Sequence, residues 1–528
     1  MGRPNHWRPT YAALMLASLT ACSAPLGDDG PSTPRRDAGR TSTGVGGASG
    51  SGGASTGSAS STTGSSGSGG QGGTSAGSAG GAGGATGGAG GTAGTGTTGG
   101  AGGSGVDAGR TDAGKADAGK LDGGGGAGGG TVIPDGGAGM PVVEQFDTSC
   151  LNVPDPDIAA SNDLVGMVGQ WNAYFYKKNG TADHTYKWNA LQGSLISDTH
   201  IVYDVSSQKW FLTTILENPT GAAYGVQFMV STDATASTWK LSVPVNDSAL
   251  IDNPQPTVTS DKVLVVFHGN SAWVVDKADL YAGNAKVVAP SSTTLRSADN
   301  WVAVKYGGTP PSTAYAVTLL DNTHLSWISV DGTHATNDIN LQVHNVTVPN
   351  IPTAPVWGNG GVTISSNQIE AGEVKAMWQN NHLYWAKTFT CSTGTCERLY
   401  DINTSTNTAV ATDFSLTGQQ LWFGVPGVDK FQNVWMLASA AGAAGPIGLA
   451  LMGKYAAGTT YAPTKIVPGT TTFSGTGQVR AGDYTSAAQD PVDGSVWMIG
   501  MYGAGSPNPL NTERGNAGCK AVHVIPSQ

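Results

Sequence analysis

Residues 480–502 read Arg-Ala-Gly-Asp-Tyr-Thr-Ser-Ala-Ala-Gln-Asp-Pro-Val-Asp-Gly-Ser-Val-Trp-Met-Ile-Gly-Met-Tyr, and they predict two strands around a tight turn. Asp493-Gly494 supplies the positive-φ positions that hairpin turns favour, and the apolar run that follows contains a tryptophan. The stretch decides the fold because variants of it recur upstream.

Six further hairpins share this pattern of a strand, turn residues and a return strand. Successive hairpins begin about 40 to 75 residues apart, and no stretch between them shows sustained helical periodicity. The chain beyond residue 154 is therefore predicted to be nearly all β. The six hairpins lie at residues 158–168, 200–215, 256–267, 301–320, 374–385 and 423–437.

A β-only repeat of about 50 residues is typical of a propeller, in which four-stranded blades bury their faces against one another around an axis. Seven hairpins predict a seven-bladed β-propeller. A six-bladed propeller is the alternative, because the first and fourth repeats are weak. A tandem of β-sandwiches is a more distant one, since sandwiches would not repeat one hairpin seven times.

One turn carries a family resemblance. Ser231-Thr-Asp233-Ala-Thr-Ala-Ser-Thr-Trp239 resembles the Asp box of sialidase-like propellers, a turn between the third and fourth strands of a blade. Compared with the Asp box of that family, this stretch has one extra residue and lacks the glycine of the box. It occurs once in the chain rather than in several blades. The resemblance implies sialidase-like propeller architecture, with the box as a structural turn.

Composition separates the chain into two parts. More than half of the 80 glycines lie before residue 141, whereas every tryptophan except Trp7 lies beyond residue 170. Residues 22–145 are therefore predicted to be a disordered low-complexity linker, and residues 146–528 the β-propeller domain. As a Gly/Ser-rich coil the linker would have an r.m.s. reach on the order of 60 Å. A net charge of −10 argues against nucleic acid as a partner.

The N-terminus predicts export. Arg3 and Arg8 precede an apolar run that is too short to span a membrane and suits a signal peptide. The run ends in Leu19-Thr-Ala-Cys22, which resembles the box of bacterial lipoprotein signals. That resemblance implies a signal peptide over 1–21 and a lipid on Cys22. The protein would then be anchored to the outer membrane, at the cell surface or the periplasmic face. An ordinary secretory signal is the alternative.

Five cysteines in an exported protein leave one unpaired unless Cys22 carries lipid. Cys391 and Cys396 flank a short loop with a glycine, and we expect them to form a disulfide. Cys150 and Cys519 lie at the two ends of the apolar-rich region, where a bridge would close the ring. Metal binding is less favoured, because no cluster of His or acidic residues stands near either pair.

Acidic residues recur just before the expected innermost strands, which would place them at one mouth of the central channel. They either cap turns and backbone N–H groups or form a rim that binds a cation or a polar glycan. Arg480, Tyr484 and Trp301 would be neighbours of such a rim. The acidic residues are Asp157, Asp198, Asp252, Asp299, Glu373 and Asp483.

The sequence favours a binding or interaction module for extracellular glycan or protein. The protein is expected to be monomeric, and no cofactor other than a structural cation is predicted. The alternative is a glycoside hydrolase-like enzyme with its site at the acidic mouth; a purely structural protein is a third. Sialidase chemistry needs three convergent arginines, a tyrosine nucleophile and paired acids, and the domain has only four arginines. No catalytic residue is predicted.

Overall fold

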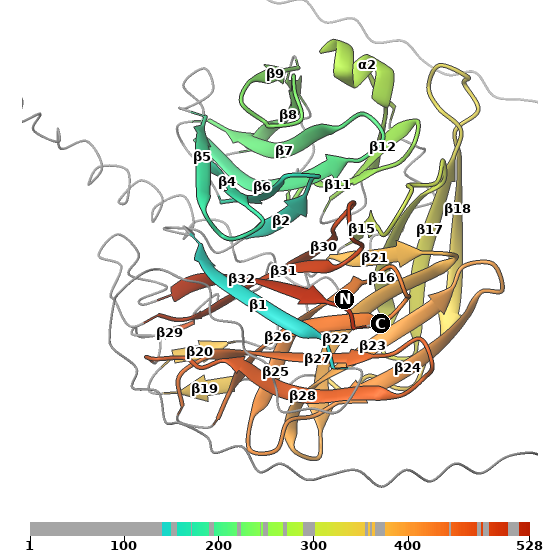
Figure 1. Ribbon diagram of the computed structural model, residues 1–528. Coiled ribbons are helices and arrows are strands. Elements are labelled where there is room, and N and C mark those ends of the chain that lie inside the picture. Colours follow the sequence, from blue (N-terminus) through green and yellow to red (C-terminus); the bar gives the residue numbers. More distant parts are fainter. Residues whose placement is uncertain are drawn as a thin grey trace, which may run out of the picture. The chain divides into compact units, whose positions relative to one another are not determined.

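The fold was determined from a computed structural model. Figure 1 shows the elements. The structure describes residues 140–148, 156–169, 172–188, 195–218, 223–242, 244–246, 252–267, 272–288, 301–353, 357–359, 362–364, 375–442, 445–471, 477–478, 485–504 and 517–527.

All described strands except β19, β20 and β29 form seven antiparallel groups, six of four strands and one of five, which we number as blades in chain order. In blade 2 two short strands share the outer position, and blades 4 and 5 join through parallel pairing of their first strands.

The strands of blades 1 to 4 are β2 (Asp157–Ala160), β3 (Leu164–Val168), β4 (Asn172–Lys177), β5 (Ala182–Lys187); β6 (Leu195–Asp204), β7 (Lys209–Glu217), β8 (Ala223–Ser231), β9 (Trp239–Leu241), β10 (Val245–Asn246); β11 (Gln255–Val258), β12 (Lys262–Val266), β13 (Ala272–Asp276), β14 (Val287–Val288); and β15 (Val302–Tyr306), β16 (Ala314–Asp321), β17 (His324–Asp331), β18 (Asn340–Thr347). The strands of blades 5 to 7 are β21 (Ala376–Gln379), β22 (His382–Cys391), β23 (Gly394–Asn403), β24 (Thr408–Phe414); β25 (Gln420–Val428), β26 (Val434–Ala441), β27 (Gly448–Lys454), β28 (Thr460–Val467); and β30 (Ser486–Gln489), β31 (Val496–Gly503), β32 (Ala517–Ile525), β1 (Val142–Thr148). The one described helix, α2 (Lys277–Ala282), follows β13.

The first strands of the blades form a closed ring. Each contacts the first strand of the next blade, and β30 of blade 7 contacts β2 of blade 1. Blade 7 takes its outer strand from the beginning of the domain, because β1 pairs with β32 along its whole length. In Figure 1 the cyan β1 accordingly lies beside the red β32.

This topology confirms the all-β propeller. Each of the seven predicted hairpins coincides with the first two strands of a blade. The number of blades in the whole domain stays a prediction, because parts of the chain lie outside the described residues.

In blades 6 and 7 the turns between first and second strands are built around buried aspartates. Asp429 accepts hydrogen bonds from the backbone N–H of Phe431 and from the indole of Trp435. Asp490 does the same for Val492 and Trp497. Because the carboxylate satisfies the turn amides and the indole together, the Asp–Trp spacing in the sequence fixes the hairpin.

The core consists of layers between neighbouring blades rather than one central mass. One cluster joins blades 1 and 2 around Phe175 and Trp210, and another joins blades 1 and 7 around Trp497. Packing is close enough to require glycine at position 166, where a Cβ atom would lie 2.6 Å from the Trp210 ring.

The Asp-box-like stretch forms the turn between β8 and β9, as the resemblance implies. The Asp233 carboxylate accepts hydrogen bonds from the amides of Thr235 and Ser237 at 3.0 and 3.2 Å. Trp239 then packs against Tyr186 of blade 1, with ring centroids 5.4 Å apart. The box therefore ties two blades together.

The disulfide between Cys391 and Cys396 is confirmed and closes the β22–β23 hairpin. Cys519 is disulfide-bonded as well, and it pairs with Thr148 in the β1–β32 ladder. Cys150 lies outside the described residues, so its pairing with Cys519 stays a prediction.

Two connections between blades carry a small sheet of their own. β19 (Trp357–Asn359) and β20 (Val362–Ile364) lie between blades 4 and 5, and β29 (Gly477–Gln478) lies between blades 6 and 7. β20 and β29 pair in parallel, so the two connections meet.

Candidate functional site

The ring has two faces. We call the end at which the first strands begin the start face, and the end at which first and second strands are joined the turn face. All connections longer than ten residues leave the start face, namely 289–301, 348–375, 468–485 and 504–516.

Asp157, predicted for the rim of the start face, lies inside the ring and is buried. Its carboxylate accepts hydrogen bonds from the backbone N–H groups of Ile158 and of Ile201 in the next blade, at 2.8 and 3.1 Å. For this residue the structure supports the interpretation that the acid satisfies backbone groups between blades.

Lys305 reaches Asp157 across the ring from blade 4. Its ammonium donates to Asp157 Oδ1 and to Ser486 Oγ of blade 7, at 2.5 and 2.8 Å. Burial opposes ionisation of Asp157, but the charge of Lys305 and a hydrogen bond to His200 outweigh it and hold the pKa of Asp157 well below its usual range. A buried ion pair therefore joins three blades at the centre.

His200 extends this network. Its Nδ1 lies 3.3 Å from Asp157 Oδ2, and its Nε2 lies 2.5 Å from Asn253 Oδ1 of blade 3. Burial, together with the positive charge of Lys375, lowers the pKa of His200 to about 4. The imidazole is therefore neutral at physiological pH, and its single N–H can donate to Asp157 or to Asn253 but not to both.

Asp198 lies within the first strand of blade 2 rather than before it, Asp252 precedes the first strand of blade 3, and both lie toward the start face. Asp198 has a φ of 47° and accepts a hydrogen bond from the Asn253 amide at 3.3 Å. It stands at a β-bulge in β6, which explains a left-handed backbone at an aspartate. Asp252 is exposed.

Glu217 joins this group, although sequence reasoning did not place it on the rim. It ends β7 and accepts a hydrogen bond from Ser197 Oγ at 2.6 Å. Burial raises the pKa of Glu217, and the negative charge of Asp252 raises it further. Because β7 runs antiparallel to β6, its last residue lies at the face where β6 begins, and only this pairing could have predicted the position of Glu217.

The structure buries Trp301, a predicted neighbour of the rim, within the layer between blades 3 and 4. Five predicted rim residues lie outside the described residues, as does Cys22, and their roles stay predictions. The five are Asp299, Glu373, Arg480, Asp483 and Tyr484.

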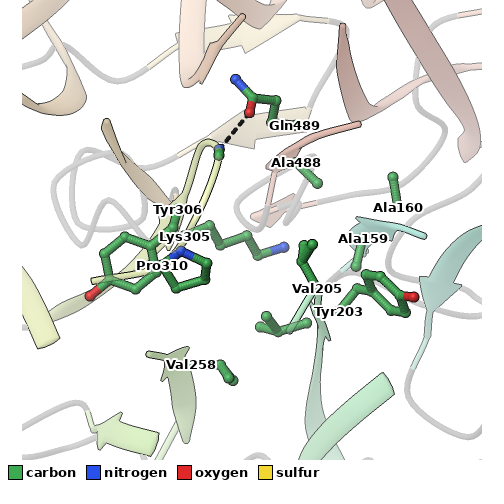
Figure 2. Close-up of a pocket in the computed structure, with 12 residues that line it drawn as sticks. Ala159, Ala160, Tyr203, Val205, Val258, Lys305, Tyr306, Pro310, Ala488 and Gln489 are labelled. Atoms are coloured by element: carbon green, nitrogen blue, oxygen red, sulfur yellow. Dashed lines mark hydrogen bonds between the residues drawn. The ribbon is translucent and has the colours of Figure 1, made fainter. Parts of the chain in front are cut away.

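The turn face has a pocket at the axis, shown in Figure 2. Its lining comes from blades 1, 2, 3, 4 and 7 and stands at the ends of first strands or in the turns that follow them. Lys305 forms its inner end, so the buried ion pair lies between this pocket and the start face. The lining residues are Ala159, Ala160, Val202, Tyr203, Val205, Val258, Lys305, Tyr306, Gly308, Pro310, Ala488 and Gln489.

Two groups of possible metal ligands occur among the described residues: Asp276, Asp279 and His334, and Asp490, Asp493 and His523. Neither belongs to the predicted rim. In the second, Asp490 already binds Lys178 and Trp497. The cation predicted at the rim thus stays a prediction. No helix in the described part of the chain is long and apolar enough to span a membrane.

No protein-family model matches the sequence, and no curated protein matches it either. Among solved structures, the chain is similar to the endosialidase of phage phi92, with 7% identity, a TM-score of 0.38 and coverage of 74% of this chain and 70% of that one. It is also similar to BamB from Moraxella catarrhalis, with 11% identity, a TM-score of 0.33 and coverage of 72% and 100%. A third is the WD40 domain of SCAP from fission yeast, with 7% identity, a TM-score of 0.33 and coverage of 70% and 84%. Likenesses this distant carry nothing about function, and the fold rests on the strand pairing itself.

Proposed function

We propose that this protein is a surface-tethered lipoprotein whose propeller is a binding module for an extracellular polysaccharide or protein, with its ligand on the start face. The observation that carries the proposal is the unequal distribution of connections. Every connection longer than ten residues leaves the start face, and two of them are joined by β20 and β29. Long loops on a rigid scaffold are where binding residues concentrate.

The described side chains of that face suit a polar ligand. Asp198, Glu217 and Asp252 offer carboxyl groups toward the start face, and carboxylates are strong acceptors for sugar hydroxyls. Asp252 is exposed, so a ligand can reach it without displacing the core. The predicted rim residues outside the described part would extend the same surface.

A glycoside hydrolase is the second candidate, and the Glu217–Asp252 pair favours it. Hydrolysis of a glycosidic bond uses one carboxyl group that stays protonated and a second that is ionised. Burial and the charge of Asp252 raise the pKa of Glu217 in that direction. Asp252 would be the second carboxyl group of the pair.

The tether is proposed from the sequence. Cys22 would carry the lipid, and residues 23–145 would hold the propeller away from the outer membrane. A Cys22→Ser variant should lose incorporation of labelled palmitate and appear in the medium or the periplasm. Retention in the membrane with label still incorporated would refute the anchor.

The binding proposal is tested with the unlipidated Cys22→Ser chain on a glycan array. We expect one class of glycan to bind, and Asp252→Ala to weaken that binding, whereas Val410→Ser on the outer strand β24 should leave it unchanged. Release of reducing ends, lost in Glu217→Gln, would establish the enzyme instead. If no glycan binds, the glycan ligand is refuted, and equal binding by the Asp252→Ala variant would remove the site from this face.

A further inference from the structure

We propose that the turn-face pocket is a second binding site, which anchors an apolar side chain of a protein partner that carries a basic residue beside it. The site is independent of the start face. It stands at the axis, and five blades contribute to its lining. A point at which so many blades converge is fixed by the whole ring and is therefore preorganised.

The larger part of the pocket wall is apolar. Val205 and Val258 contribute aliphatic side chains to the lining, and Tyr203, Tyr306 and Pro310 contribute rings (Figure 2). Small residues, Ala159, Ala160 and Ala488, leave room between them. Burying an aliphatic side chain against such walls removes apolar surface from water on both partners.

Most polar groups of the lining are already bonded within the protein, but the Tyr203 hydroxyl has no hydrogen-bond partner among the described residues. The Lys305 ammonium donates to Asp157, Ser486 and the Ile158 carbonyl. The Gln489 amide donates to Gln379 Oε1 and Val428 O and accepts the Gly308 N–H shown in Figure 2.

The Tyr306 hydroxyl donates to Thr313 O at 3.0 Å and accepts the Tyr315 N–H at 3.3 Å. The Tyr203 hydroxyl is shielded from solvent, so the pocket presents the Tyr203 ring. A sugar bound here would lose water from its hydroxyls and find few free partners, whereas an apolar side chain has no hydroxyls to desolvate.

Two carboxylates outside the lining act electrostatically on Tyr203 of the pocket wall. Asp163 lies exposed in the turn between β2 and β3, and its carboxylate has no partner among the described residues. Burial raises the pKa of Tyr203 to about 12, and the charges of Asp163 and Asp204 add to that shift. Because Lys277 pairs with Asp204, Asp163 is the charge left for a partner. A Lys or Arg next to the anchor would complement it.

The turn face displays exposed apolar side chains, one of them Val205 of the lining. Val205, Phe431 and Val492 have relative exposures of 39%, 40% and 65%. The turns of Phe431 and Val492 are held by Asp429 and Asp490, and the two turns are joined through a hydrogen bond from one to the other. Rigid apolar side chains around a central pocket are the arrangement that protein anchors use.

The test uses the Cys22→Ser chain and saturation-transfer NMR with capped tripeptides. We expect acetyl-Lys-Leu-Lys-amide to receive saturation at its leucine methyl groups. Acetyl-Glu-Leu-Glu-amide should bind several-fold more weakly, and acetyl-Lys-Ser-Lys-amide should show no saturable binding. Val205→Asp changes an exposed turn residue and should weaken the first peptide about fivefold or more, the scale of a lost anchor contact. Asp163→Asn should remove the preference for Lys over Glu.

Two further variants keep the result interpretable. Ala488→Leu fills the pocket and should abolish binding, and an unchanged far-ultraviolet CD spectrum shows whether it folds. Val410→Asp introduces the same charge as Val205→Asp at a 58% exposed position on β24 and should bind like the parent. The proposal is overturned if the leucine peptide shows no saturable transfer, or if Val205→Asp binds as the parent does. Binding of maltotriose that competes with the peptide would make the pocket a glycan site and would also overturn it.

Discussion

Glu397 gives the sharpest test of how the blades are packed. It lies on β23, is fully buried, and accepts a hydrogen bond from Thr388 Oγ1 at 2.6 Å. Against it stands Gly424 of blade 6, where a Cβ atom would lie 2.7 Å from Glu397 Oε2. Burial raises the pKa of Glu397 to about 7, although the Thr388 hydrogen bond, the Gly424 amide and the charge of Lys387 oppose the shift. The perturbation is Glu397→Gln, which keeps the shape and removes the titration.

The sign and size follow from linkage. A carboxyl whose pKa is raised from 4.5 to about 7 in the folded state binds its proton more tightly there than in the unfolded chain. Its contribution to stability is fully present below pH 4.5 and is lost as the pH rises through about 7. A shift of this size corresponds to about 3 kcal/mol, as an order of magnitude. The glutamine variant has no such loss.

The assay is urea unfolding of parent and variant at pH 5 and pH 8.5 with the disulfides intact. The difference between variant and parent should move in favour of the variant by up to about 3 kcal/mol between the two pH values. Any fixed cost of the amide cancels in this double difference, as do all other titrating groups. If the difference is the same at both pH values, Glu397 is not buried as a proton-binding group, and the packing of blade 5 on blade 6 is wrong.

Three other predictions concern stability and are checked by urea unfolding at pH 7. Lys305→Met leaves Asp157 buried without its cation and should cost about 3–5 kcal/mol, and adding Asp157→Asn should recover part of that loss. Replacing both cysteines of the Cys391–Cys396 disulfide by serine should cost about 2 kcal/mol, because the bridge closes only a short loop. Trp497→Phe leaves Asp490 without its indole donor and should cost about 1–3 kcal/mol.

Most of the fold could be predicted because its signals are local. In blades 6 and 7 an Asp-turn-Trp pattern specifies the hairpin through contacts within a few residues, as at Asp490 and Trp497, where the carboxylate accepts the indole N–H of the same hairpin. The outer strand of blade 7 could not be found this way. β1 pairs with β32, and only ring closure relates Val142 to Ile525.

The candidate sites were harder to predict, because they depend on contacts between blades. Asp157 and Lys305 are 148 positions apart in the chain, and no local pattern relates them. The sequence places Asp157 at the start of a strand, but whether it faces solvent depends on a lysine three blades away. Glu217 was not predicted for the rim for the opposite reason. It ends a second strand, and it lies at the start face only because that strand runs antiparallel to the first.

Lys305 also determines how far the two proposed sites can influence each other. Its stem lines the turn-face pocket, and its ammonium holds Asp157, which in turn contacts His200 and through it Asn253 beside Asp198. A ligand changes the affinity at the other face only by as much as it favours one arrangement of this chain over another, and the effect is the same in both directions. An apolar anchor that contacts the Lys305 stem without displacing the ammonium favours neither arrangement of this chain over the other. The two faces therefore bind independently unless a ligand breaks the Lys305–Asp157 pair. If that pair couples the two faces, the Lys305→Met variant loses the effect of one ligand on the affinity for the other. If the faces are independent, neither the parent nor the variant shows such an effect.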